Sequence, residues 1–145
     1  MNQSNLSRFA PALLRWAMAL VYLYFGYSQL TSGESWTAVV PEWATGLSGL
    51  SAATIVQING TFEIIASITL ALGVAVRPVA LLLFAHLMVI TFNFGFSPLG
   101  VRDFGLSFAT LAVALRGPDE FCLRSRKSYR PAGSDLAGDK VDSSS

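Results

Sequence analysis

The feature that most constrains this chain is a long stretch that is almost free of charge. Between Phe9 and Leu115 the only Asp, Glu, Lys and Arg side chains are Arg15, Glu34, Glu42, Glu63, Arg77, Arg102 and Asp103. Soluble domains carry about 25% charged residues, whereas this chain has 13% and is 52% hydrophobic. So few charges could not cover a surface facing water, but a surface facing lipid needs none. The sequence therefore predicts an integral membrane protein.

The uncharged segments predict four transmembrane helices. About 20 apolar residues cross a bilayer as a helix, and clusters of glycine, proline and serine separate the segments. We expect an all-α, four-transmembrane-helix bundle within residues 1–118, with spans at 9–30, 54–76, 79–95 and 102–117. The fourth span is the shortest, because its uncharged part covers only residues 104–115. The polar residues 119–145 are expected to form a disordered tail.

The basic residues predict the orientation. Four spans place both termini on one side of the membrane, and Arg8, Arg77, Arg116 and the basic tail share that side. Cytoplasmic loops carry the excess of Lys and Arg, so both termini are predicted to be cytoplasmic. The net charge is only +1, which gives no reason to expect nucleic acid as a partner; the expected surroundings are the lipid bilayer.

Polar and small side chains recur at helical spacing and predict a shared interior. These stripes are Arg15, Ala19, Tyr22, Gly26 and Gln29 in the first span, Asn59, Gly60, Glu63 and Ser67 in the second, His86 and Asn93 in the third, and Asp103, Ser107, Thr110 and Ala114 in the fourth. The candidate intramembrane polar site taken from them consists of Arg15, Glu63, His86, Asn59, Asn93, Arg102 and Asp103.

Arg15 and Glu63 are the two charges placed deepest in the spans. An unpaired charge at mid-membrane costs about 3 kcal/mol on insertion scales. One interpretation is a structural ion pair that locks the first two spans together. A second is that both charges line a small-molecule or proton site. In a third, Arg15 extends to the interface and Glu63 is neutral.

His86 and Asp103 each have a structural and a functional interpretation. His86 either bonds a neighbour or serves as a proton relay or a hydrogen-bond donor to a quinone. In one interpretation Asp103 caps the N-terminus of the fourth helix and Arg102 beside it faces the lipid headgroups; in the other they have a role at the mouth of a site.

The cysteine and histidine counts limit the chemistry. Cys122 and His86 are the only residues of their types. A zinc site built from the Cys and His residues of one chain is therefore excluded, as is a haem held by two histidines of one chain. No metal site and no self-sufficient catalytic constellation is predicted, and the sequence leaves open whether the chain is an enzyme.

The order of several short motifs resembles the DoxX family of small bacterial membrane proteins. The matching pieces are Leu14-Arg15-Trp16, Phe25-Gly26-Tyr27 with Leu30, Gly60-Thr61-Phe62-Glu63, Leu70-Ala71-Leu72-Gly73, Arg77-Pro78-Val79-Ala80-Leu81, Arg102-Asp103-Phe104-Gly105-Leu106 and Leu115-Arg116-Gly117. They cover about residues 9–120. The resemblance implies a multi-pass protein of the bacterial inner membrane. Members often have a lysine near the end of the first helix, where this chain has Gln29.

The resemblance also implies a link to membrane redox chemistry, since some relatives belong to quinone-reducing sulfur oxidation and others to oxidative-stress complexes. The first hypothesis is an accessory or scaffold subunit of a membrane redox or oxidative-stress complex, with a redox enzyme as its partner. The second is a quinone-binding subunit of a membrane oxidoreductase. The third is a small-molecule carrier working as a homo-oligomer, because one chain of this length has little room for alternating access.

Overall fold

The computed structural model describes residues 3–123, with side chains from Phe9 onward. The regular secondary structure of the described residues consists of helices, joined by turns and loops: α1 (Gln3–Thr31), α2 (Gly33–Thr37), α3 (Glu42–Ser48), α4 (Ala52–Ala71), α5 (Val76–Phe94) and α6 (Pro98–Arg116). Four of them, α1, α4, α5 and α6, are long and apolar enough to cross a membrane. The predicted all-α fold with four membrane-spanning helices is confirmed.

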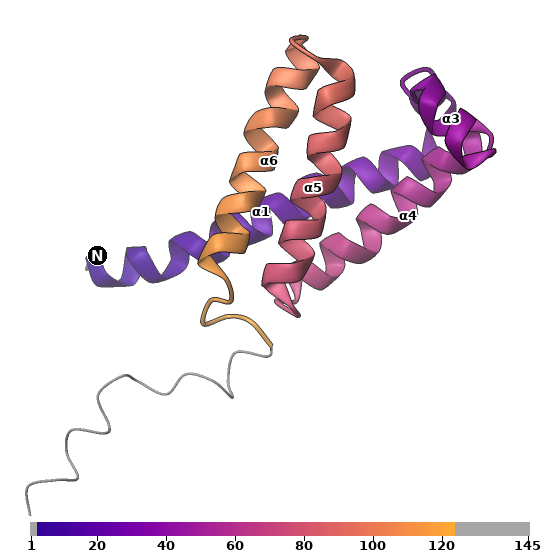
Figure 1. The fold of residues 1–145 in the computed structure, drawn as a ribbon. Helices are drawn as coiled ribbons and strands as arrows, with labels where there is room; N and C mark the ends of the chain where they lie inside the picture. The colour runs from indigo at the N-terminus through magenta and orange to yellow at the C-terminus, as the bar shows by residue number, and fades with distance from the viewer. Residues whose placement is uncertain (1–2, 124–145) are drawn as a thin grey trace, which may run out of the picture.

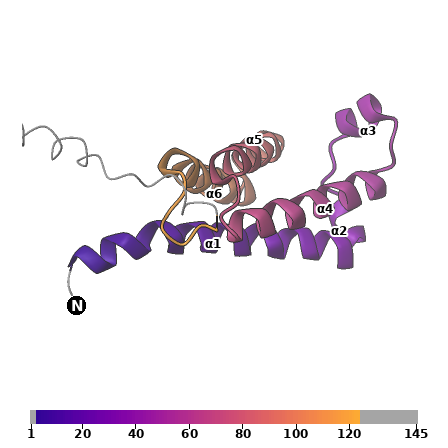
Figure 2. The same cartoon turned by 90° about the horizontal axis from the view of Figure 1, so that it is seen from below.

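The long helices form two layers. Helix α1 packs along α4 and helix α5 packs along α6, and the contacts between the pairs are fewer (Figure 1). Seen from below, the α5–α6 pair lies across the α1–α4 pair (Figure 2). Helices α4 and α5 follow one another in the chain but belong to different layers, so they diverge from the tight turn that joins them.

The start of the fourth span differs from the prediction because a capping residue begins the helix earlier in the chain. Helix α6 begins at Pro98, because the Ser97 side chain accepts a hydrogen bond from the Gly100 N–H (3.1 Å) and proline is favourable at a first helical position. The fourth span therefore has 19 residues, enough to cross the membrane. The predicted loop between the first two spans contains the short helices α2 and α3.

The predicted stripes of α1, α4 and α6 face the interior, whereas that of α5 does not. All five stripe residues of α1 and all four of α6 are buried, as are Gly60, Glu63 and Ser67 of α4. Between the layers, Tyr22 Oη lies 3.0 Å from Thr110 Oγ1. On α5 the buried face is instead Val76, Ala80, Leu83, Leu87 and Thr91. This face is turned by one residue from the predicted stripe, which leaves His86 at its edge and Asn93 exposed.

Residues 119–123, which we predicted to belong to the tail, fold back onto the helix ends. Asp119 and Cys122 are buried, and the Leu123 N–H donates to the carbonyl of Leu72 (3.2 Å). The rest of the predicted tail, residues 124–145, lies outside the described residues.

Candidate functional site

Glu63, midway along α4, is the centre of a buried polar cluster. Glu63 is only 1% exposed. Gln29 Nε2 donates to Glu63 Oε2 at 2.9 Å, and Asn59 Nδ2 donates to Gln29 Oε1 at 2.7 Å and to Glu63 Oε1 at 3.3 Å. His86 Nε2 lies 3.2 Å from the same Oε1 atom. Three long helices therefore place hydrogen-bonding groups around one carboxyl group.

Two glycines let α1 and α4 approach closely enough for this cluster to form. A Cβ atom at Gly26 would lie 2.7 Å from the carbonyl oxygen of Gly60, and one at Gly60 would lie 2.9 Å from the carbonyl oxygen of Gly26. Small residues at helix contacts in membranes permit such backbone contact. The approach sets Gln29 against Glu63, since a Cβ at Gly60 would also lie 3.0 Å from the Cβ of Gln29.

A partly open cavity lies on one side of Glu63. It has a volume of about 310 Å³, and residues of α1, α2, α4, α5 and α6 line it. Its polar wall includes Gln29, Glu63, Arg102 and Asp103. Trp36 of α2 also lines the cavity and donates from Nε1 to Ser28 Oγ (3.1 Å). The cavity thus lies toward the end of the bundle that carries the loop between α1 and α4.

A lateral groove lies on another side, between α4 and α5. It has a volume of about 520 Å³ and is lined mainly by apolar side chains, among them Ile58, Leu82 and Val89, with His86 and Asn59 as its polar members. The side chain of His86 is 21% exposed and meets the Phe62 ring edge-on, with ring centroids 5.1 Å apart. The hydrogen bond between His86 and Glu63 therefore joins a lipid-facing groove to the cavity beside Glu63.

Arg102 and Asp103 stand at the cavity wall near the start of α6. Arg102 Nε donates to Asp103 Oδ1 at 2.8 Å, and the Asp103 side chain is only 4% exposed. The Arg102 guanidinium lies over the Phe25 ring, 5.3 Å from its centroid. Our interpretation of Asp103 as the N-terminal cap of the fourth helix is wrong, because the helix begins earlier and Ser97 is its cap.

Comparison with known families matches the DoxX family model over residues 10–95. This range is more than half of the chain, and it contains Gly26, Gln29, Gly60, Glu63 and His86. The chain belongs to the DoxX family. The predicted resemblance is confirmed, although the DoxX match ends after α5 and leaves α6 outside it. No curated protein and no solved structure matches the chain.

Membership of the DoxX family and the four apolar helices make this a multi-pass membrane protein. Gln29 stands where we expect many DoxX members to have a lysine, and it fills that place with an amide that hydrogen-bonds Glu63. A neutral group therefore contacts the buried carboxyl group in this DoxX chain, and within residues 9–123 no arginine or lysine side chain forms an ion pair with it.

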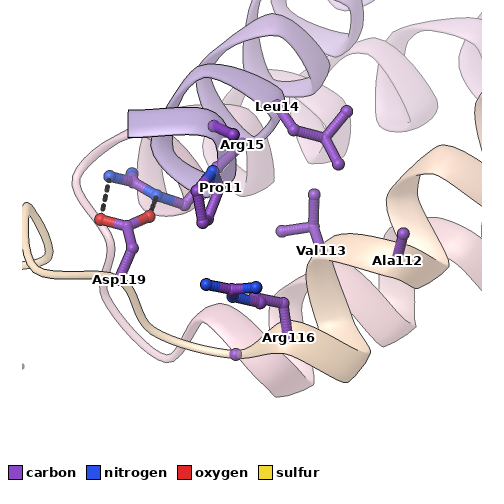
Figure 3. Close-up of a pocket in the computed structure, with 9 residues that line it drawn as sticks. Pro11, Leu14, Arg15, Ala112, Val113, Arg116 and Asp119 are labelled. Carbon is purple, nitrogen blue, oxygen red and sulfur yellow. Dashed lines mark hydrogen bonds and ion pairs between the residues drawn. The ribbon is translucent and has the colours of Figure 1, made fainter. Parts of the chain in front are cut away.

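Arg15 does not pair with Glu63, and that predicted ion pair is wrong. Arg15 Nε donates to Asp119 Oδ2 at 2.8 Å and Nη2 to Oδ1 at 3.3 Å (Figure 3). Arg15 Nη1 donates to the carbonyls of Leu70 (2.8 Å) and Ala71. The prediction failed because Arg15 lies beside the C-terminus of α4, where the carbonyls of Leu70 and Ala71 and the carboxylate of Asp119 satisfy its guanidinium.

The segment 117–123, here called the C-terminal clasp, is held at several points. Phe121 stacks on Phe9 with ring centroids 5.2 Å apart. Burial by itself would raise the pKa of Asp119, but hydrogen bonds from Arg15 and from the Phe121 N–H outweigh it, so the pKa of Asp119 is lowered from its ordinary value. Burial raises the pKa of the Cys122 thiol, which lies against Gly73.

Asn93 also lies outside the Glu63 cluster. Its Oδ1 accepts a hydrogen bond from Trp43 Nε1 at 2.9 Å, which ties α3 to the end of α5. Among the described residues, no three His, Cys, Asp or Glu side chains lie close enough together to hold a metal ion. Of the candidate site residues, the structure thus gathers Glu63, His86 and Asn59 in the cluster and places Arg102 and Asp103 across the cavity.

Two residues of these networks were missing from the predicted site. Gln29 is in the polar stripe of the first span, three residues after Gly26, and that spacing is the signal that could have included it. Asp119 follows Gly117-Pro118, where the sequence marks the end of a helix. No local pattern indicates that this carboxylate returns to α1.

Proposed function

We propose that this DoxX protein is the quinone-binding subunit of a membrane redox system in the bacterial inner membrane. The observation that carries the proposal is the His86–Glu63 hydrogen bond, which connects an apolar groove open to lipid with a cavity that has Gln29, Glu63, Arg102 and Asp103 in its wall. Lipophilic molecules reach a protein from the bilayer, and an apolar site with few polar groups orients them.

The residues present fit a quinone. The groove between α4 and α5 is apolar and long enough to reach from Leu82 to Leu50, which suits an isoprenoid chain. The partly exposed His86 is the group at its wall that could hold a carbonyl oxygen, through Nδ1, because Asn59 already donates to Gln29 and Glu63. A bound quinone would supply two-electron, two-proton redox chemistry.

The protein's own part in this function is to hold and move protons. A proton that passes between Glu63 Oε1 and His86 Nε2 links the cavity to the groove, while Gln29 and Asn59 keep the carboxyl group in place. Histidine and glutamate chains in membranes commonly serve as such relays. The electrons would come from a redox enzyme as partner, so the proposed role is that of an accessory subunit that contains a quinone site.

Quinone retention in lipid nanodiscs tests the proposal. The wild-type protein is loaded with a ubiquinone or menaquinone, and the bound quinone is counted after washing. We expect His86→Leu to lower retention about fivefold, the effect of one lost hydrogen bond. Ala85→Phe, which fills the groove without touching Glu63, should also lower it.

Glu63→Gln separates binding from proton transfer. The amide keeps one acceptor oxygen, which can take the place of Oε1 for Asn59, so we expect retained quinone but slower quinone reduction when a redox partner is supplied. Thermal unfolding of each variant checks that the fold survives. Equal retention in wild type, His86→Leu and Ala85→Phe would sink the proposal.

A further inference from the structure

A second cavity lies between α1 and α6 at the opposite end of the bundle from the loop that joins α1 to α4. It has a volume of about 270 Å³, and its walls are the apolar Ala10, Pro11, Leu14, Ala112 and Val113, with Arg15, Arg116, Gly117 and Asp119 at its polar end (Figure 3). The cleft exists because α1 and α6 belong to different layers and make few contacts. One end of the cleft is apolar, and the other end carries charged side chains.

The charges at the polar end do not cancel. Arg15 is neutralised by Asp119, and both are buried. Arg116, in the last turn of α6, is exposed and extends from α6 toward α1 in Figure 3. The Arg77 side chain lies against Gly117, which lines the polar end, because a Cβ at Gly117 would lie 2.6 Å from Arg77 Nε. Neither arginine forms an ion pair with another residue of the described part of the chain.

The position of the cleft matches the edge of the membrane. Arg116 is the last residue of the span in α6, and Ala10 and Pro11 are at the start of the span in α1. A phosphate group at Arg116 would lie at headgroup level, with the acyl chains continuing along the apolar wall. Basic pockets between transmembrane helices on the cytoplasmic side are typical sites for anionic lipid headgroups.

We propose that the cleft between α1 and α6 binds an anionic phospholipid, with Arg116 and Arg77 contacting its phosphate and the small side chains of α1 and α6 accommodating an acyl chain. A lipid in this place would also fill the gap between the two helix layers. The site is separate from the Glu63 cluster, and the proposal does not depend on the function proposed there.

Native mass spectrometry of the full chain in mixed micelles of phosphatidylglycerol and phosphatidylcholine tests the site. We expect the wild-type protein to retain phosphatidylglycerol in preference to phosphatidylcholine. Arg116→Gln should lower that preference about fivefold, which is the contribution of one basic residue near an anionic surface. Arg116→Lys keeps the charge and should keep the preference.

A second variant tests the apolar part of the cleft. Ala112→Leu leaves every charge in place but fills the space for an acyl chain, so we expect it to lose both lipids. If Arg116→Gln does not fold, the comparison of Ala112→Leu with Arg116→Lys decides the question. An unchanged lipid ratio in Arg116→Gln, or unchanged retention in Ala112→Leu, would overturn the proposal.

Inorganic phosphate and glycerol phosphate distinguish a lipid from a soluble anion. If the phospholipid site is correct, millimolar concentrations of either compound leave the phosphatidylglycerol bound. Displacement of the lipid by these small anions, or their binding to wild type without any lipid preference, would assign the arginines to a soluble phosphate and overturn the lipid proposal.

Discussion

Arg15 and Asp119, which are 104 residues apart in the chain, form a buried ion pair with Arg15 Nε 2.8 Å from Asp119 Oδ2. The same guanidinium donates to the last carbonyls of α4, so one side chain joins α1, α4 and the C-terminal clasp. Cations near a helix C-terminus also offset the negative end of the helix dipole. This relationship holds the C-terminal clasp against α1 and α4.

Removing either partner should destabilise the fold strongly. We expect Asp119→Asn and Arg15→Gln each to lower the free energy of unfolding by about 3 kcal/mol, because each leaves a buried charge without its partner. Chemical unfolding in detergent, followed by circular dichroism, measures the loss. The double variant should lose less than the sum of the two single variants; strict additivity would show that the two side chains do not interact.

The clasp should weaken in acid. The pKa of Asp119 is lowered in the folded protein from its ordinary value of 3.8. Its stabilising contribution is therefore complete above pH 3.8 and is lost as the pH falls through the lower folded-state value. We expect the difference in melting temperature between wild type and Asp119→Asn to be constant from pH 5 to pH 7, values chosen for the assay, and to shrink below about pH 4. A difference independent of pH would contradict this assignment.

The reactivity of Cys122 should show whether the C-terminal clasp is packed against Gly73. A Cβ at Gly73 would lie 2.6 Å from both the Cα and the Sγ of Cys122, and Gly73 has a φ of 72°. Gly73→Ala should cost about 1–2 kcal/mol for the left-handed backbone alone and push Cys122 outward. We expect a maleimide to label Cys122 slowly in the wild type, since the thiol is buried and its pKa is raised, and faster in Gly73→Ala. Equal labelling rates would show that the two residues are not in contact.

The contact between Gly26 and Gly60 should tolerate no side chain. We expect Gly26→Ala and Gly60→Ala each to cost about 1–3 kcal/mol through overpacking. Gly105→Ala is the matched control, because a Cβ there meets nothing within 4 Å; it should stabilise the helix by about 0.5–1 kcal/mol. Thermal unfolding of the three variants compares them, and similar behaviour of Gly60→Ala and Gly105→Ala would refute the close approach.

Gln29 should contribute to stability, because its side chain donates a hydrogen bond to the buried carboxyl group of Glu63. Gln29→Leu leaves the buried carboxyl group without one donor, and we expect a loss of about 1–3 kcal/mol. Gln57→Leu is the control: it removes the same amide from an exposed position of α4 and should change stability by less than about 0.5 kcal/mol. Equal effects of the two substitutions would mean that the Gln29 hydrogen bonds contribute nothing.

The spans and the buried stripes could be predicted from the sequence, because lipid and protein interior select residue types along each helix separately. Asn59, Glu63 and His86 were named on this basis and lie together. Asn93 was named for the same reason but is exposed. The sequence of α5 has few polar residues and does not show which face is buried, since apolar residues occur both on the buried face (Leu87) and on the exposed one (Val89 and Phe92).

By itself the sequence determined that lipid surrounds this chain, how many helices cross it and which faces of three of them turn inward. Each of these follows from hydropathy and helical spacing, which act within one segment. Only the tertiary structure decided which charges meet, because pairing depends on the layer and height of each helix. The contact between Gly26 and Gly60 places Gln29 within hydrogen-bond distance of Glu63. The chain folds back after α6 and places Asp119 against Arg15.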